Sequence, residues 1–330
     1  MMQNYVKIVQ EFVEEQRVGI ACALVAGVGV LALQRWKAGG VCRSKACLNG
    51  KTVLITGANT GIGKETAVDI AKRGARVILA CRDLDRAHAA AEDIRKRSGN
   101  NDVVVKKLEL ASLQSVRALA KDIHEHEDRL DILINNAGIM MCPKWKTEDG
   151  FEMQFGVNHL GHFLLTNLLL DKLKKSAPSR IVNVSSCAHE KGQIYFDDIN
   201  LDKDYDPLKS YQQSKLANVL FSRELAARLK GTGVCVYSLH PGVVNTELGR
   251  YLFSTMALWK IILFKPLFLI LKSPWQGAQT TIYCAVDEGL QNTTGLYYSD
   301  CAPKEEAPQA KSDSAARRLW DLSASMVEMA

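Results

Sequence analysis

The stretch Lys51-Thr-Val-Leu-Ile-Thr56, followed by Gly57-Ala-Asn-Thr-Gly61-Ile-Gly63-Lys64, decides the fold of this 330-residue chain. Its first six residues form a short, β-branched run typical of a buried parallel strand. The glycines allow a tight turn and let backbone amides and a helix N-terminus approach a pyrophosphate. The pattern predicts a dinucleotide-binding turn formed by Gly57, Ala58, Asn59, Thr60, Gly61, Ile62, Gly63 and Lys64.

Further apolar runs of strand length alternate with helical patterns along the chain. They lie at residues 76–80, 103–110, 130–134, 180–184 and 234–239. Such alternation predicts an α/β protein with a Rossmann-type, doubly wound parallel sheet. We expect a single catalytic domain over residues 50–300, preceded by an N-terminal membrane-anchor helix.

Arg82 lies nineteen residues after Gly63, close to where this type of fold contacts the adenosine ribose. An acidic residue there would bind a ribose 2′-hydroxyl, whereas an arginine suits a 2′-phosphate. The position therefore favours NADP(H) over NAD(H). Asp83 follows at once and keeps the alternative open.

Tyr211 and Lys215 are one turn apart at the start of a helical pattern, so their side chains share one face. A free tyrosine has a pKa near 10, too high for efficient proton exchange at neutral pH. A neighbouring ammonium favours the phenolate and is expected to lower that pKa. On its own this spacing is also common on solvated helix surfaces.

Together these motifs resemble the short-chain dehydrogenase/reductase superfamily over roughly residues 50–300. The agreement in order and spacing covers Thr56 to Gly63, Asn135-Asn-Ala-Gly138, Asn158, Ser186, Tyr211-x-x-x-Lys215, Pro241-Gly242 and Thr246. The stretches 150–162 and 214–220 are similar to the vertebrate retinol dehydrogenases numbered eleven to thirteen. Where the superfamily usually has Asp-Leu near the adenine, this chain has Glu109-Leu110.

The resemblance implies roles for individual residues. Tyr211 would exchange the proton and contact the cofactor, Lys215 would lower its pKa and bind the cofactor ribose, and Ser186 would bind the substrate oxygen. Asn158 would hold a water that connects the lysine to solvent. The remaining cofactor contacts implied are Leu110, Asn136, Ala137, Gly138, Pro241, Gly242 and Thr246.

Residues 18–33 carry no charge and would span about 24 Å as a helix, slightly short of a bilayer core of about 30 Å. Glu11, Glu14 and Glu15 argue against a cleaved signal sequence, whose first part is basic. We therefore predict a membrane anchor at residues 1–38 and a basic linker at 39–49. The basic residues after the anchor place the catalytic domain in the cytosol.

Residues 251–275 are apolar but are interrupted by Lys260, Lys265, Pro266 and Lys272. This composition suits a segment that lies on a bilayer, and equally a lid over an apolar substrate pocket. Residues 301–330 are expected to form a polar tail with a short helix at 315–320.

Composition limits the other classes of function. The net charge is +6, and residues 1–49 with six basic and three acidic side chains supply half of it, without the arginine-rich run expected for nucleic-acid binding. Nine cysteines without regular spacing indicate free thiols. Cys42 and Cys47 have no second pair at zinc spacing, and His159 and His162 are better interpreted as helix packing or surface, so no metal site is expected.

The resemblance implies an NADP(H)-dependent enzyme that interconverts retinal and retinol. A reductase of other lipid aldehydes or of steroids, and a non-catalytic cofactor-binding scaffold, are the alternatives. Expected partners are a retinoid or another apolar aldehyde or alcohol and membrane lipid, with a homodimer left open. The expected location is the endoplasmic reticulum membrane, with the mitochondrial inner membrane as second choice.

Overall fold

A computed structural model describes residues 38–251 and 271–329, together with isolated positions between 14 and 29. Most of the predicted anchor and residues 252–270 of the predicted lid lie outside the described residues. Within the described part, no helix combines the length and the apolar character needed to cross a membrane.

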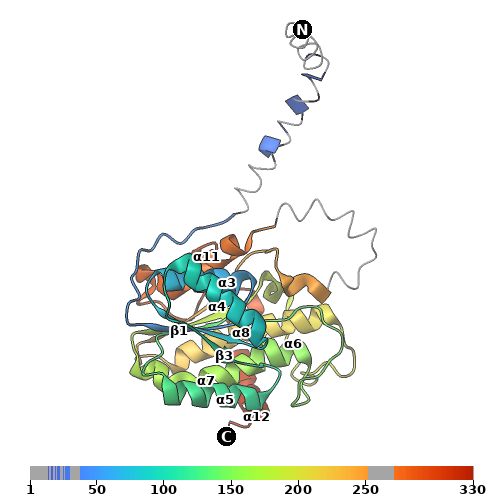
Figure 1. The fold of residues 1–330 in the computed structure, drawn as a ribbon. Helices are drawn as coiled ribbons and strands as arrows, with labels where there is room; N and C mark the ends of the chain where they lie inside the picture. Colours follow the sequence, from blue (N-terminus) through green and yellow to red (C-terminus); the bar gives the residue numbers. More distant parts are fainter. Residues whose placement is uncertain are drawn as a thin grey trace, which may run out of the picture.

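An eight-stranded sheet with the order β3-β2-β1-β4-β5-β6-β7-β8 forms the centre of the molecule (Figure 1). All neighbouring strands are parallel except β7 and β8, which pair antiparallel. The strands are β1 Thr52–Thr56, β2 Arg76–Cys81, β3 Val103–Lys107, β4 Ile132–Asn135, β5 Ser179–Val184, β6 Val234–His240, β7 Leu296–Ser299 and β8 Ala302–Pro303.

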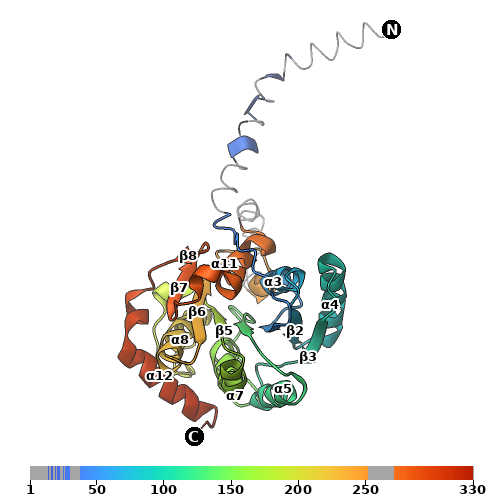
Figure 2. The ribbon, with the colours of Figure 1, turned by 90° about the vertical axis from the view of Figure 1, so that its left-hand side faces the viewer.

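Helices cover both faces of the sheet, as the doubly wound prediction requires. Figure 2 shows α3, α4 and α11 on one face and α5, α7 and α8 on the other. The longer helices are α3 Gly61–Lys72, α4 Leu84–Ser98, α5 Leu113–His126, α7 Gly161–Lys175, α8 Pro207–Arg228, α11 Pro274–Val286 and α12 Asp313–Met326. Short helical segments are α6 Met153–Phe155, η1 Gly156–Leu160, η2 Cys187–Lys191, η3 Glu247–Gly249, η5 Glu288–Leu290 and η6 Pro308–Lys311.

The six strands predicted from apolar runs are present, with ends that differ by one to three residues. The largest difference is at β3, which ends at Lys107 instead of residue 110. Buried apolar side chains fill both faces of the sheet, so two hydrophobic clusters hold the helices in place. The parallel strands therefore carry their following turns to one edge of the sheet, where a ligand site is expected.

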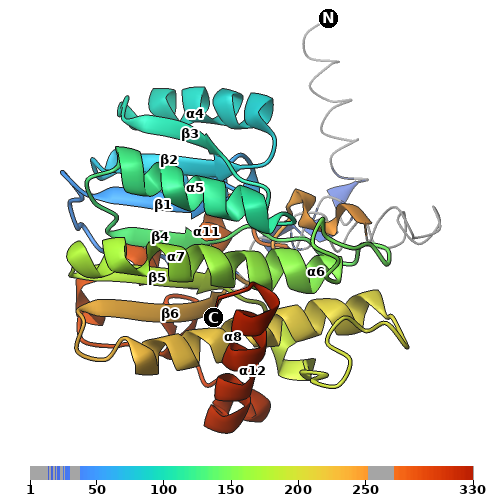
Figure 3. The ribbon, with the colours of Figure 1, turned by 90° about the horizontal axis from the view of Figure 1, so that it is seen from below.

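The C-terminal segment packs against the domain. Its helix α12 is longer than the helix predicted at residues 315–320. Helix α12 contacts α8, as Figure 3 shows. Leu319 is buried in the core, and the ring of Trp320 lies 5.0 Å from that of Phe163 on α7. This segment thus packs against α7 and against α8, the helix that carries Tyr211 and Lys215.

Candidate active site

The turn between β1 and α3 passes very close to the turn after β4. Gly57 has a φ of 65°, and a Cβ placed there would lie 2.9 Å from the Cβ of Ala137. A Cβ at Gly63 would lie 2.5 Å both from Nδ2 of Asn136 and from the Gly57 carbonyl oxygen. Both positions therefore require glycine, because any side chain would push the two turns apart.

Thr56 holds these two turns together through hydrogen bonds. Its Oγ1 accepts from the backbone N–H of Asn136 at 2.9 Å and of Ala137 at 3.0 Å. In return, Nδ2 of Asn136 donates to the Thr56 carbonyl oxygen at 2.9 Å. The ends of β1 and β4 consequently form one rigid cradle of backbone groups.

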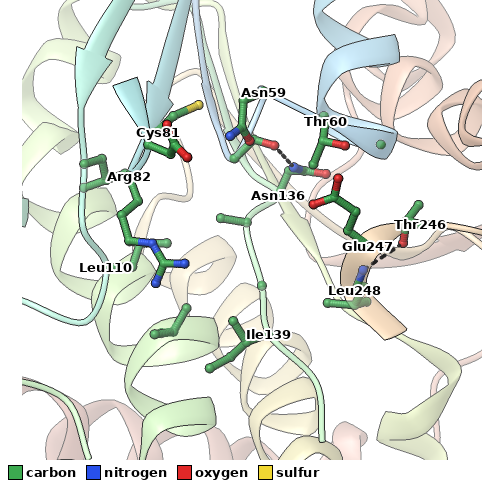
Figure 4. Close-up of a pocket in the computed structure, with 18 of the residues that line it drawn as sticks. Asn59, Thr60, Cys81, Arg82, Leu110, Asn136, Ile139, Thr246, Glu247 and Leu248 are labelled. Carbon is green, nitrogen blue, oxygen red and sulfur yellow. Dashed lines mark hydrogen bonds between the residues drawn. The ribbon is translucent and has the colours of Figure 1, made fainter. Parts of the chain in front are cut away.

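A cavity of about 330 Å³ opens above this cradle (Figure 4). Most residues that the sequence assigns to the cofactor line it: Gly57, Asn59, Thr60, Gly61, Ile62, Gly63, Arg82, Leu110, Asn136, Ala137, Gly138 and Thr246. In the close-up, Arg82 lies on one side of the space, while Thr246 and Glu247 lie on the opposite side.

Six residues predicted to bind the cofactor do not line the cavity: Ala58, Lys64, Tyr211, Lys215, Pro241 and Gly242. Ala58 is fully buried beneath the turn. Lys64 makes an ion pair with Asp93 of α4 at 2.9 Å, which holds its ammonium on the helix surface. Pro241 and Gly242 follow β6, and Gly242 packs against Lys272: a Cβ at Gly242 would lie 2.8 Å from Cδ of that lysine.

The side chain of Arg82 is 63% exposed, and its Nε lies 3.5 Å from Oε2 of Glu109. Asp83, which kept an NAD(H) assignment open, accepts a hydrogen bond from the backbone N–H of Arg86 at 3.0 Å and so caps α4. One oxygen of that carboxylate is therefore engaged in helix capping.

The cavity has further lining residues that the sequence reading did not assign: Arg86, Leu108, Ile139, Trp145, Met153, Val157, Glu247, Leu248 and Arg250. Arg86 and Glu247 form an ion pair at 2.6 Å that links α4 to η3. Arg86 lies in the first turn of α4, four residues after Arg82, so a place near the adenosine position could have been inferred from the sequence. Nothing in the sequence pointed to Trp145, which lies in a connection between strands.

Tyr211 and Lys215 lie on α8 and are almost completely buried, at 5% and 3% exposure. Nζ of Lys215 is 5.7 Å from the centre of the Tyr211 ring and donates a hydrogen bond to the Val184 carbonyl oxygen at 3.1 Å. Ser186 follows β5, and its hydroxyl accepts from the backbone N–H of Ala188 at 3.2 Å. The phenol, the ammonium and the serine are thus brought together from two elements.

The electrostatics of this pair differ from the sequence-based expectation. Burial raises the pKa of Tyr211 to about 12, while a hydrogen bond with Ser186 acts in the opposite direction. Burial also lowers the pKa of Lys215 to about 8. The expected lowering of the tyrosine pKa by Lys215 is not found in the protein alone, because removal from water disfavours the phenolate more than the nearby groups favour it.

Asn158 lies in η1, a π-helical turn, and is fully buried. Its Oδ1 accepts from the Ile139 N–H at 2.9 Å, and its Nδ2 donates to the Ile139 carbonyl and to Oγ of Ser214. A Cβ at Gly138 would lie 3.2 Å from Oδ1 of Asn158 and 3.6 Å from Nζ of Lys215. The asparagine, the lysine and the cradle therefore meet at Gly138.

Metal-binding side chains do not gather here. Among the residues that the structure describes, no group of three or more His, Cys, Asp or Glu side chains could hold a metal ion. His159 and His162, which were interpreted as packing or surface residues, are both buried, so the surface alternative is wrong.

A parallel sheet with a glycine cradle at the carboxyl ends of its strands is typical of a Rossmann-type dinucleotide-binding protein. Residues 51–257 match the short chain dehydrogenase family model. The chain is 55% identical to human retinol dehydrogenase 13, covering 93% of each sequence, and 52% identical to mouse retinol dehydrogenase 11, covering 89% and 92%. It therefore belongs to the short-chain dehydrogenase family, on the branch of retinol dehydrogenases 11, 12 and 13.

Solved structures agree with this assignment. A crystal structure of an uncharacterized protein from Mycobacterium paratuberculosis has a TM-score of 0.71 and 36% identity, covering 88% of this chain and 98% of that one. A short chain dehydrogenase of Escherichia coli CFT073, solved with NADPH, has a TM-score of 0.61 and 25% identity, covering 78% and 99%.

Proposed function

We propose that this enzyme is an NADP(H)-dependent retinal reductase and retinol dehydrogenase in which Tyr211 exchanges the proton with the substrate oxygen. One observation carries the proposal: a buried Tyr211–Lys215 pair whose ammonium lies beside Gly138, within the same cradle that the glycine turn forms. A surface pair would have no such neighbour. The retinoid follows from the named relatives.

The cradle fits a dinucleotide. At Gly57 and Gly63 only a residue without a Cβ leaves room for two turns to meet, and the N-terminus of α3 faces the cavity with its unpaired amides. When bound, the nicotinamide supplies or receives the hydride at the carbonyl carbon. The residues of the chain hold it, orient the substrate and move the proton.

Arg82 is the residue that supports NADP(H). Its guanidinium is exposed at the adenosine end of the cavity, where it can bind a 2′-phosphate. Asp83 is the residue that could instead bind a ribose hydroxyl, and one of its two carboxylate oxygens already caps α4. The cofactor preference therefore depends on one arginine whose only ion pair among the described residues, with Glu109, is long at 3.5 Å.

The proton moves in the direction that the pKa values favour. With a pKa of about 12, Tyr211 carries its proton at neutral pH and can donate it to the carbonyl oxygen as reduction proceeds. Ser186 donates a second hydrogen bond to the same oxygen, and Lys215, with a pKa of about 8, stabilises the phenolate that results. Asn158 would hold a water that connects the lysine to solvent.

The membrane assignment is supported by where two predicted segments meet. Gly39 is the first residue after the predicted anchor, and a Cβ there would lie 2.5 Å from Nζ of Lys272, near the end of the predicted lid. The described residues next to the anchor and at one end of the lid are therefore neighbours, which suits an apolar substrate entering from a bilayer. The proposed location is the endoplasmic reticulum membrane with the domain in the cytosol, ahead of the mitochondrial inner membrane.

Parallel turnover measurements test the proposal. We expect purified protein to reduce retinal with NADPH much faster than with NADH, and faster than it reduces nonanal or a ketosteroid. A preference for nonanal or the steroid would contradict the proposed retinoid substrate but not the proposed carbonyl reduction. Absence of turnover with any of the three, in protein that binds NADPH, would favour a scaffold.

A further inference from the structure

His162 lies on α7 between the cofactor cradle and the candidate catalytic group, and no role has been assigned to it. Its side chain is 2% exposed. Nε2 lies 2.9 Å from Oγ1 of Thr56, and Nδ1 lies 3.1 Å from the backbone carbonyl oxygen of Asn158. Both ring nitrogens are therefore engaged, one on each side of the site.

The hydrogen bonds of Thr56 determine which nitrogen carries the proton. A threonine hydroxyl accepts two hydrogen bonds and donates one. Both acceptor positions of Oγ1 are used by the N–H groups of Asn136 and Ala137. The hydroxyl hydrogen must then go to Nε2 of His162 at 2.9 Å or to the Ile134 carbonyl at 3.5 Å, and the shorter contact is favoured.

It follows that Nε2 is an acceptor and that the proton of His162 is on Nδ1. That Nδ1–H donates to the Asn158 carbonyl, which needs a donor at this position. Burial, together with the charge of Lys215, lowers the pKa of His162 to about 4, so the ring is neutral at physiological pH. A single neutral tautomer of His162 thus connects Thr56 of the cradle to Asn158.

The connection continues into α8. Nδ2 of Asn158 donates to Oγ of Ser214 at 2.9 Å, and that hydroxyl donates to the Tyr211 carbonyl at 2.8 Å. A single hydrogen-bonded path therefore runs from the cradle through Thr56, His162 and Asn158 to the helix of the proton donor.

We propose that His162 is a positioning residue, which sets Asn158, and through it Tyr211 and Lys215, relative to the cofactor cradle. The proposal rests on the proposed function, because it assigns His162 to the same reaction. It predicts that loss of the two hydrogen bonds lowers kcat while the cradle still binds NADPH. If His162 only stabilised the fold, its replacement would lower stability and leave kcat per folded molecule unchanged.

The test compares His162→Leu, which fills similar volume without hydrogen bonds, with His162→Gln, whose amide keeps one donor and one acceptor. His159→Leu is the matched control, because His159 is a buried, neutral histidine of the adjoining turn that contacts Ser323 and not the cradle. We expect His162→Leu to lower kcat about tenfold to a hundredfold, as small misplacements in active sites do. The Kd for NADPH should stay unchanged, His162→Gln should recover most of the kcat, and His159→Leu should keep the wild-type kcat.

Equal kcat values for His162→Leu and His159→Leu, or a loss confined to NADPH affinity, would overturn the proposal. Should His162→Leu not fold, His162→Asn replaces it, because its shorter amide cannot reach both partners. Equal kcat values for His162→Asn and His162→Gln would be equally decisive against it.

Retinal, nonanal and a ketosteroid are all used as substrates. A wild type that reduces another carbonyl but not retinal refutes only the proposed substrate, and the His162 comparison proceeds on the compound that is turned over. A wild type that binds NADPH and reduces none of them contradicts both proposals.

Discussion

Replacing Gly63 by alanine should selectively weaken cofactor binding. The added Cβ would lie 2.5 Å from Nδ2 of Asn136 and from the Gly57 carbonyl oxygen, whereas ordinary contacts begin at 3.4 Å. The two turns must therefore separate by about 0.9 Å, and the bond from Asn136 to the Thr56 carbonyl must lengthen. Overpacking of this kind costs about 1–3 kcal/mol.

If that cost falls on the cradle, NADPH affinity should decrease about fivefold to 150-fold, since about 1.4 kcal/mol corresponds to a factor of ten. Titration of purified protein with NADPH, followed by fluorescence, measures this change. Gly99→Ala is the control: Gly99 has a φ of 73° at the end of α4, with open space around it, so alanine strains the backbone far from the cradle. We expect that control to lower Tm and keep the Kd. A folded Gly63→Ala protein with the wild-type Kd would refute the proposed cradle.

Three further changes have defined expectations. Arg82→Asp should weaken the binding of NADPH about tenfold to a hundredfold and that of NADH far less, because charge-assisted contacts to a phosphate are lost. Equal effects on the two affinities in parallel titrations would show that Arg82 does not bind the 2′-phosphate. The kcat for reduction should be constant below pH 7 and fall above about pH 8. The reason is that Lys215 loses its proton there, while Tyr211, with a pKa of about 12, keeps its proton. A kcat that rises through pH 8 would contradict this order of the two pKa values. Gln309→Ala should lower Tm and raise the KM for the carbonyl substrate without changing the Kd for NADPH, because the two hydrogens of Nε2 of Gln309 are shared among three carbonyl oxygens of the segment after Ser186. An unchanged KM at unchanged Tm would show that these hydrogen bonds do not hold the segment in place.

The sheet could be predicted because its central strands are local, uninterrupted apolar runs. The strands at the β7–β8 edge of the sheet were harder to predict. Strand β7 includes Tyr297 and Tyr298, which are buried, but the run is only four residues long and follows a polar turn. Strand β8 has two residues, one of them proline, and is defined only by its pairing with β7. Such elements depend on tertiary contacts that no local pattern encodes.

Within the site, spacing was enough to predict that Gly57, Gly63 and Arg82 lie around one cavity. It failed where a distant partner decides a side chain's role. Lys64 sits in the glycine motif, but Asp93 of α4 holds it on the helix surface. From the sequence, His162 was interpreted as packing or surface, because its partner Thr56 is more than a hundred residues away. The pKa of Tyr211 likewise depends on burial, which sequence spacing does not reveal.

The central claim is that the Tyr211 hydroxyl supplies the proton for carbonyl reduction. The most direct test is single-turnover reduction of retinal by Tyr211→Phe with saturating NADPH, beside a Kd measurement for NADPH. The substitution removes one oxygen from a buried side chain, so we expect a folded protein that binds NADPH like the wild type and forms no retinol. Retinol formation at the wild-type rate in that variant would contradict the account.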